Sequence, residues 1–404
     1  MKNNRVLFAI LAVAAVLLFL GVLIIILPGS FQSLTPKTED KPSLGFGSQA
    51  VKGEITEVLE EGQVQLGDVD QQYQVLRVRI LEGDLEGVEL EVEYGKQQIR
   101  PEGLFLKPGD RVFLTLSSNQ DNILQARFQD FERTGPLLIL FSTFVLFSVL
   151  ISGRKGIRAL LGMGISIGVI IFYIIPQILE GKDPVLISVS GAFFLLAATL
   201  YLVYGWTLKT HAAVLGTLSS LLLTALLAHY FVDLTRLTGF GNEDALFLVQ
   251  QSSGKINMQG LVLGGMLIGA LGVLDDLVIT QASVVFELWS LNPEMALMDL
   301  FRRSMRVGQD HVAATVNTLV LAYAGAALPM FLLFSISGAQ IGYLLNLEYV
   351  AEEVVRTMVG SLGLIAAVPF TTILASLVAK RSAGEGSIWK YLGPATSGRG
   401  GHHH

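Results

Sequence analysis

Eight long apolar segments constrain this chain more than any other feature of its sequence. Each approaches the roughly 20 apolar residues that a membrane-spanning helix needs. A helix satisfies its backbone hydrogen bonds internally, as a segment in hydrocarbon must. Only 15% of the residues are charged, against about 25% in soluble domains. We therefore predict an α-helical polytopic membrane protein with about eight transmembrane helices. The segments are 6–27, 136–152, 158–176, 184–205, 212–232, 258–286, 310–336 and 357–379.

The first apolar segment, 6–27, follows two basic residues, Lys2 and Arg5, and ends at Pro28. It is longer than the apolar core of about 7–15 residues in a secretory signal, and no small-residue cleavage motif follows it. We interpret residues 1–28 as an uncleaved N-terminal transmembrane anchor.

Residues 47–135 differ in composition from the rest of the chain. Polar and apolar residues alternate with period two at 76–80, 88–94 and 112–116, and Gly- and Pro-containing turn signals separate these stretches. Strands at such spacing are typical of a small all-β barrel or sandwich. We predict an inserted five-stranded OB-like domain. No site-like cluster stands out in it, so we interpret it as a structural or docking module.

Basic residues predict how the chain crosses the membrane. They concentrate in short loops on one side, as expected for cytoplasmic loops. This pattern places both termini in the cytoplasm and the β-domain outside. It gives a seven-helix transmembrane domain at 136–380 and a cytoplasmic tail at 381–404, which ends in the remnant of a purification tag. The basic residues are Arg154, Lys155, Arg158, Lys209, Arg302, Arg303, Arg306, Lys380 and Arg381.

Several classes of function lack a sequence signal. The formal net charge is -6 without a basic block, which disfavours nucleic-acid binding. The absence of cysteine excludes disulfides, Cys-zinc sites and thiol catalysis. The chain has no phosphate-binding glycine loop, zinc-protease motif or hydrolase nucleophile motif. His211, His229 and His311 stand apart from one another. We expect neither an enzyme nor a cofactor, and a metal is left open.

The segment 258–286 carries a face of small and polar residues. At about 100° per residue, Gly265, Gly269, Gly272, Asp276, Thr280, Ser283 and Glu287 share one stripe. Gly265 and Gly269 form a small-x-x-x-small motif that lets a neighbouring helix approach. Ionisable groups inside a span are costly and mark functional sites. We select Asp275, Asp276, Thr280, Gln281 and Ser283 as candidate ion- or substrate-binding residues. The alternative is a pair of packing carboxylates bonded to neighbouring hydroxyls.

The last two segments contribute three further candidates, Asn317, Thr318 and Thr371. At about 1.5 Å per residue, they lie at a depth similar to that of Asp276, as a central binding site requires. Pro369 frees a backbone carbonyl nearby. Near the outer end, Glu352 and Arg356 are spaced for a local i,i+4 ion pair.

The chain resembles the YibE/F family of bacterial membrane proteins. Three regions carry the resemblance: the glycine stripe with Asp275 and Asp276 at 261–283, the stretch from Asn317 to Pro329, and the stretch from Gly360 to Thr371. With the order of anchor, β-domain and helices, it extends over about residues 50–380. The resemblance implies a permease-like protein of the bacterial cytoplasmic membrane, and it supplies no catalytic residues.

Three hypotheses follow. The first is a secondary transporter or channel for an ion or small solute, with a central polar site between the last three spans. The second is a membrane scaffold or sensor whose external β-domain binds an envelope partner. The third is a membrane enzyme that acts on lipid. The expected partners are the lipid bilayer, the transported species and, as an open alternative, further copies of the chain, but not nucleic acid.

Overall fold

The computed structural model describes residues 50–83, 85–101, 103–118, 124–338, 340–382 and 392–395. The expected anchor at 1–28 and almost all of the expected tail at 381–404 lie outside these residues. The chain forms two compact units that divide between Leu150 and Ile151, and each is described by itself. We call them the β unit and the helical unit.

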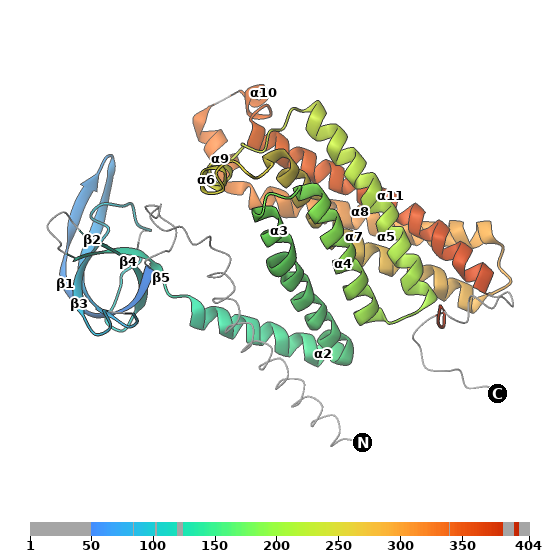
Figure 1. The fold of residues 1–404 in the computed structure, drawn as a ribbon, viewed down its shortest axis with the longest axis horizontal. Coiled ribbons are helices and arrows are strands. Elements are labelled where there is room, and N and C mark those ends of the chain that lie inside the picture. The colour runs from blue at the N-terminus through green and yellow to red at the C-terminus, as the bar shows by residue number, and fades with distance from the viewer. Residues whose placement is uncertain are drawn as a thin grey trace, which may run out of the picture. The chain divides into compact units, whose positions relative to one another are not determined.

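Five antiparallel strands form one sheet in the β unit, in the order β3-β2-β1-β4-β5. The end strands β3 and β5 also contact each other, so the sheet curls into a ring (Figure 1). The strands are β1 (Ala50–Leu66), β2 (Val69–Ile80), β3 (Glu89–Tyr94), β4 (Arg111–Ser118) and β5 (Leu124–Phe131).

The period-two alternation explains why these segments pair. Alternate residues of β2, β3 and β4 turn into the ring, where Leu76, Val78, Val92 and Leu114 are almost completely buried. The intervening charged residues face solvent and form cross-strand pairs, such as Arg79 with Glu89 at 2.8 Å. The alternating stretches of the sequence thus fall in strands, as predicted, and the structure shows that these strands pair antiparallel.

The remaining elements are helical. They are α2 (Thr134–Val169), η1 (Ile170–Ile174), α3 (Ile175–Leu179), α4 (Pro184–Tyr204), α5 (Leu208–Leu234), α6 (Glu243–Gln251), α7 (Met258–Leu291), α8 (Leu297–Ala326), α9 (Leu328–Ser337), α10 (Ile341–Leu344) and α11 (Glu348–Ser382). By length and composition, five helices among the described residues can cross a membrane, or six if the bent pair of α8 and α9 is one span.

Four expected spans each coincide with one helix: α4, α5, α7 and α11. The expected spans 136–152 and 158–176 share a single run, Thr134–Leu179. Its backbone leaves the helical conformation at Gly153, where φ is 56° and ψ is -129°. The expected span 310–336 is bent by 60° between α8 and α9. Pro329 lies in the first turn of α9, where a residue without an N–H is tolerated.

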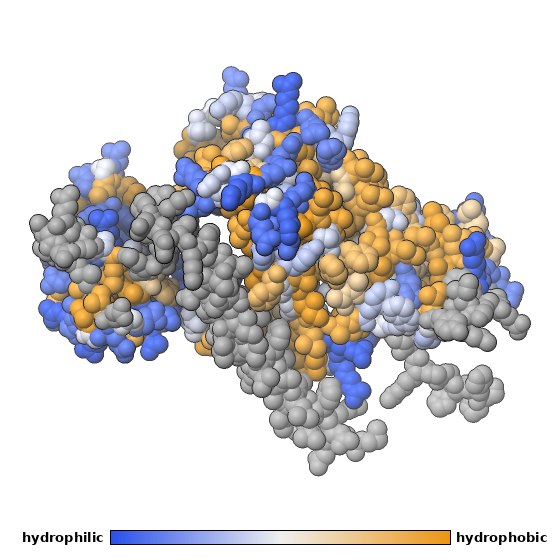
Figure 2. Space-filling view, in the orientation of Figure 1, coloured by the Kyte–Doolittle hydropathy of each residue, from blue (hydrophilic) through white to orange (hydrophobic). Residues whose placement is uncertain are grey.

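Helix α7 is at the centre of the helical unit and contacts α4, α5, α8 and α11. Its buried side, which includes Leu267, Leu274, Val278 and Phe286, belongs to the largest apolar core of the unit. In Figure 2, hydrophobic residues cover much of the visible surface of the helices, whereas the β unit is largely hydrophilic. Exposed apolar surface on this scale marks an interaction surface.

Glycines let helices α5 and α11 approach closely. A Cβ at Gly216 of α5 would overlap Thr371 of α11, and a Cβ at Gly363 of α11 would overlap Thr224 of α5. The two contacts are reciprocal and lie about two turns apart on antiparallel helices. Each threonine fills the space above a glycine, so neither glycine has room for a side chain.

This packing predicts opposite effects for two neighbouring glycines. Gly363→Ala should lower the free energy of unfolding by about 1–3 kcal/mol, because the methyl group overpacks against Thr224. Gly360→Ala, at a position with nothing within 4 Å, should raise it by about 0.5–1 kcal/mol because alanine favours the helix. Thermal unfolding of the purified variants in one detergent measures both, and equal shifts would contradict the contact.

Candidate functional site

The stripe predicted on 258–286 lies on the exposed side of α7. Gly265, Gly269, Gly272, Asp276 and Glu287 are exposed, and the two hydroxyl residues of the stripe are half-buried. Within the described chain, no atom lies within 4 Å of a Cβ built at Gly265 or Gly272. The only neighbour near Gly269 is the Tyr323 hydroxyl of α8, at 3.9 Å.

The expected close helix contact at Gly265 and Gly269 is therefore not formed within the described chain. Close contacts occur at other glycines. On α7 itself, a Cβ at Gly264 would overlap Ser188 of α4. Gly264 lies a quarter turn from Gly265, on the side that packs against a neighbour. Among the described residues, none packs against the stripe at Gly265 or Gly272.

The two adjacent aspartates of α7 have different surroundings. Asp276 is exposed, whereas Asp275 is half-buried and its Oδ1 atom is buried without a hydrogen-bond partner. Tyr204 at the end of α4 lies within electrostatic range of both. Neither carboxylate has a hydrogen bond to another residue in the described part of the chain. The alternative of packing carboxylates bonded to neighbouring hydroxyls thus finds no support.

Gln281 has a different role from the aspartates because it is buried where three helices meet. Its Nε2 atom donates to the Ser304 carbonyl of α8 at 3.1 Å and to the Thr372 hydroxyl of α11 at 2.7 Å. A Cβ at Gly308 of α8 would overlap Gln281 and Val368. The amide therefore joins α7, α8 and α11, and its donor group is already satisfied.

The other candidate residues are spread over several surfaces. Ser283 and Thr318 each donate to a carbonyl of their own helix, at 2.7 Å and 3.0 Å. Thr280 is half-buried on the stripe, and Asn317 is exposed on α8 beside Thr318. Thr371 is fully buried against α5, with no hydrogen-bond partner for its hydroxyl. The structure thus groups four candidates on one face of α7 and places Gln281 and Thr371 in helix contacts.

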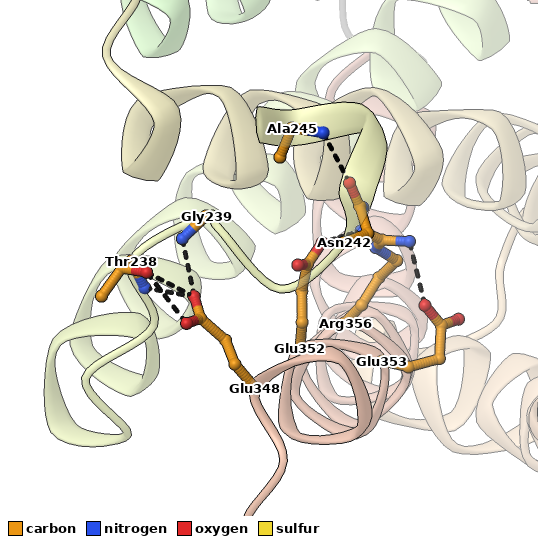
Figure 3. Close-up of polar contacts among 8 residues, drawn as sticks. All are labelled: Thr238, Gly239, Asn242, Ala245, Glu348, Glu352, Glu353 and Arg356. Carbon is orange, nitrogen blue, oxygen red and sulfur yellow. Dashed lines mark hydrogen bonds and ion pairs between the residues drawn. The ribbon is translucent and has the colours of Figure 1, made fainter. Parts of the chain in front are cut away.

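A polar cluster lies at the end of the helical unit where α11 begins (Figure 3). The Glu348 carboxylate accepts hydrogen bonds from the Thr238 and Gly239 backbone N–H groups, at 2.6 Å and 2.8 Å. Arg356 pairs with Glu352, as the spacing predicted, and with Glu353 at 3.0 Å. This cluster joins the segment after α5 to the first turns of α11.

A small cavity of about 240 Å³ adjoins this cluster. Glu352, Arg356 and Asn242 line it, together with Gly265 at one end of the α7 stripe. The side chain of Asn242 also caps α6 by accepting from the Ala245 N–H at 2.8 Å. One end of the stripe therefore adjoins a cavity that has polar side chains in a largely apolar wall.

The sequence showed only part of this cluster. Asn before the acidic start of α6 is a helix-start signal. The link from Glu348 to Thr238 spans 110 positions, so nothing local predicts it. Among the described residues, no group of three or more His, Asp or Glu side chains is placed to hold a metal ion.

A small antiparallel sheet followed by long apolar helices around a central polar-faced helix defines a class of mostly helical proteins suited to a membrane. The comparisons make the assignment specific: the family model described as YibE/F-like protein matches residues 140–381. Because that is more than half of the chain, the protein belongs to the YibE/F-like family. The comparison with curated proteins gives no match, and neither does the comparison with solved structures.

Gln281 bonds two other helices and Ser283 bonds only its own helix, so their substitution should change the free energy of unfolding by different amounts. Gln281→Leu should lower the free energy of unfolding by about 1–3 kcal/mol, because it removes two buried hydrogen bonds and leaves their acceptors without this donor. Ser283→Ala should change it by less than about 0.5 kcal/mol, because that hydroxyl bonds only its own helix. Thermal unfolding in detergent measures both values. A larger effect for Ser283→Ala would refute the structural role of Gln281.

Proposed function

We propose that the chain is a multi-pass protein of the bacterial cytoplasmic membrane, with eight crossings, both termini inside and the β unit outside. The two arms of α2 on either side of Gly153 then count as separate crossings. Support comes from the ends of the helices. Lys380 near the end of α11 donates to the Pro293 carbonyl between α7 and α8 at 2.9 Å, so these basic-rich ends share one side. The Glu348 cluster marks the opposite side.

Within this arrangement the protein acts as a permease for an ion or small solute. The observation that carries the proposal is the exposed stripe on α7, which runs from Gly265 to Glu287 over about 33 Å. This length matches a hydrocarbon core of about 30 Å. Asp276 lies at its midpoint, where an ionisable group is costly unless it meets a cavity or a transported species.

The chemistry of the stripe fits a small hydrophilic species. Glycines at three positions leave room beside the helix, and the hydroxyls of Thr280 and Ser283 follow Asp276 toward the inner end. Asp275 and Asp276 supply carboxylate oxygens, which bind a proton or a hard cation. The cavity beside Gly265 provides an entrance that is lined by Glu352 and Arg356.

One observation favours a second candidate function, a scaffold or sensor whose external β unit binds a partner in the cell envelope. The strand order and the contact of β3 with β5 agree with an OB-like barrel, a fold that presents binding surfaces on its strands and loops. This unit carries a cavity of about 1030 Å³.

Flux through liposomes tests the permease proposal. The purified protein, reconstituted and exposed in turn to gradients of H⁺, Na⁺, K⁺ and Mg²⁺, should relax at least one gradient. Asp276→Asn should reduce that flux to the level of empty liposomes, because it removes the central charge. Asp299→Asn, an exposed position in the first turn of α8, is the control and should transport like wild type. Flux that is absent, or equal in Asp276→Asn, would refute the proposal.

Deletion of residues 47–135 separates the two candidate functions. A permease should keep part of its flux without the β unit, because the stripe lies wholly in the helical unit. A scaffold or sensor should lose its cellular phenotype completely, even when the shortened protein reaches the membrane in normal amounts. Membrane fractionation and the liposome assay on the same variant give both measurements.

A further inference from the structure

The end of the β unit carries a segment that two buried glutamines hold in place. The Gln71 Nε2 atom donates to the Gly95 and Gln98 carbonyls, and its Oε1 atom accepts from the Arg100 N–H at 3.0 Å. Gln74 exchanges two hydrogen bonds with the backbone of Leu106. Each amide uses both its donor and its acceptor, so Gln98, Arg100 and Leu106 are hydrogen-bonded to side chains of β2.

This segment places the guanidinium of Arg100 inside the unit. Arg100 is only 8% exposed. Its Nη1 atom donates to the Leu104 carbonyl at 2.6 Å, and its Cζ atom lies 4.7 Å from the Phe105 ring centre and 5.5 Å from that of Tyr94. No carboxylate of the described chain forms an ion pair with it. A buried cation without a counter-charge is unfavourable, so this position suits an anion.

Arg100 lines a cavity of about 1030 Å³ that lies along β3 and β5. Three aromatic rings form its apolar wall: Tyr94 lies 4.8 Å from Phe128 between ring centres, and Phe128 lies 5.2 Å from Phe131. Charged and amide side chains line much of the remaining wall. The volume lies at the upper end of the range of small-molecule sites.

The Tyr94 hydroxyl is a second polar group of the cavity wall without a partner. Tyr94 is 5% exposed, and its hydroxyl has no hydrogen-bond partner in the described chain. Burial raises the pKa of Tyr94, and both the charge of Arg100 and the approach of its guanidinium to the hydroxyl oppose this rise only in part. The group therefore remains a protonated donor at neutral pH. Buried hydroxyls normally find a partner, and a bound acceptor beside Arg100 would supply it.

The acidic residues around the cavity do not neutralise Arg100. Glu93 pairs with Lys96 at 3.3 Å, and Asp130 pairs with Arg133 at 2.8 Å. Glu60 accepts from the Tyr73 hydroxyl at 2.6 Å. The two remaining charged residues of the lining, Glu91 and Arg127, are exposed and opposite in sign. The buried charge of the cavity is thus positive.

We propose that this cavity binds a small organic oxyanion, a carboxylate or phosphate on an aromatic or apolar body, with the anion at Arg100 and Tyr94. The body of the ligand lies against Phe128 and Phe131. This site belongs to the β unit alone and does not depend on whether the helical unit transports.

Calorimetric titration of the full-length protein in dodecyl maltoside, in phosphate-free buffer, tests the proposal. The probes are phenyl phosphate, benzoate, phenol and inorganic phosphate. Phenyl phosphate or benzoate should bind saturably, and whichever binds more tightly identifies the anion. Phenol and inorganic phosphate should each bind more weakly, because one lacks the anion and the other the apolar body.

Three variants assign the binding to this cavity. Arg100→Gln should weaken binding of the better probe about tenfold or more, because it removes charge-assisted hydrogen bonds. Tyr94→Phe should weaken it about three- to tenfold and leave the fold intact, since the hydroxyl has no partner to lose. Arg111→Gln, an exposed arginine of β4 outside the cavity, is the control and should bind like wild type.

Several outcomes would overturn the proposal. These are no saturable binding of either oxyanion, equal binding of phenol, or unchanged affinity in Arg100→Gln with a wild-type unfolding temperature. If the Arg100→Gln variant does not fold, the affinity of Tyr94→Phe for the better probe is the deciding measurement. Unchanged affinity in Tyr94→Phe would then overturn the proposal.

Discussion

Close packing of α7 against its neighbours is the constraint on which the helical unit depends. A central helix among four others is apolar on most of its circumference, and small residues let the neighbouring backbones approach. The contacts at Gly264 and Gln281 fasten α7 to α4, α8 and α11. Because these contacts use the other sides of the helix, the face with Asp276 remains open.

The open face gives the proposed permease its physical basis. In hydrocarbon an exposed carboxylate is unfavourable, so something polar has to meet Asp276 in the membrane. A transported ion, water or the polar face of a second copy would each meet that need. The half-buried Asp275 lies beside Asp276, toward α4, and one of its carboxylate oxygens has no hydrogen-bond partner. Asp275 therefore also needs a polar partner. In the proposed permease both aspartates take part in transport, whereas Gln281 joins three helices.

The charged groups of the two proposed sites, one in the β unit and one in the helical unit, have opposite signs. Along α7 the stripe offers carboxylates, which suit a proton or a cation. In the β unit the buried charge is the guanidinium of Arg100, which suits an anion. Each proposed site lies within its own unit, so the two proposals can be tested separately. A ligand-binding β unit would also make the sensor function compatible with a transporting helical unit.

The sequence by itself determined the elements of this protein, because length, hydropathy and period are local properties. It predicted a small all-β domain and long apolar helices, and it identified the stripe on α7. Only the tertiary structure decided which faces meet. Helical periodicity shows that Gly264 and Gly265 lie on adjacent faces but not which one touches a neighbour. Likewise, Gln71 brings Arg100 to Tyr94 through bonds between distant positions, and no local pattern contains them.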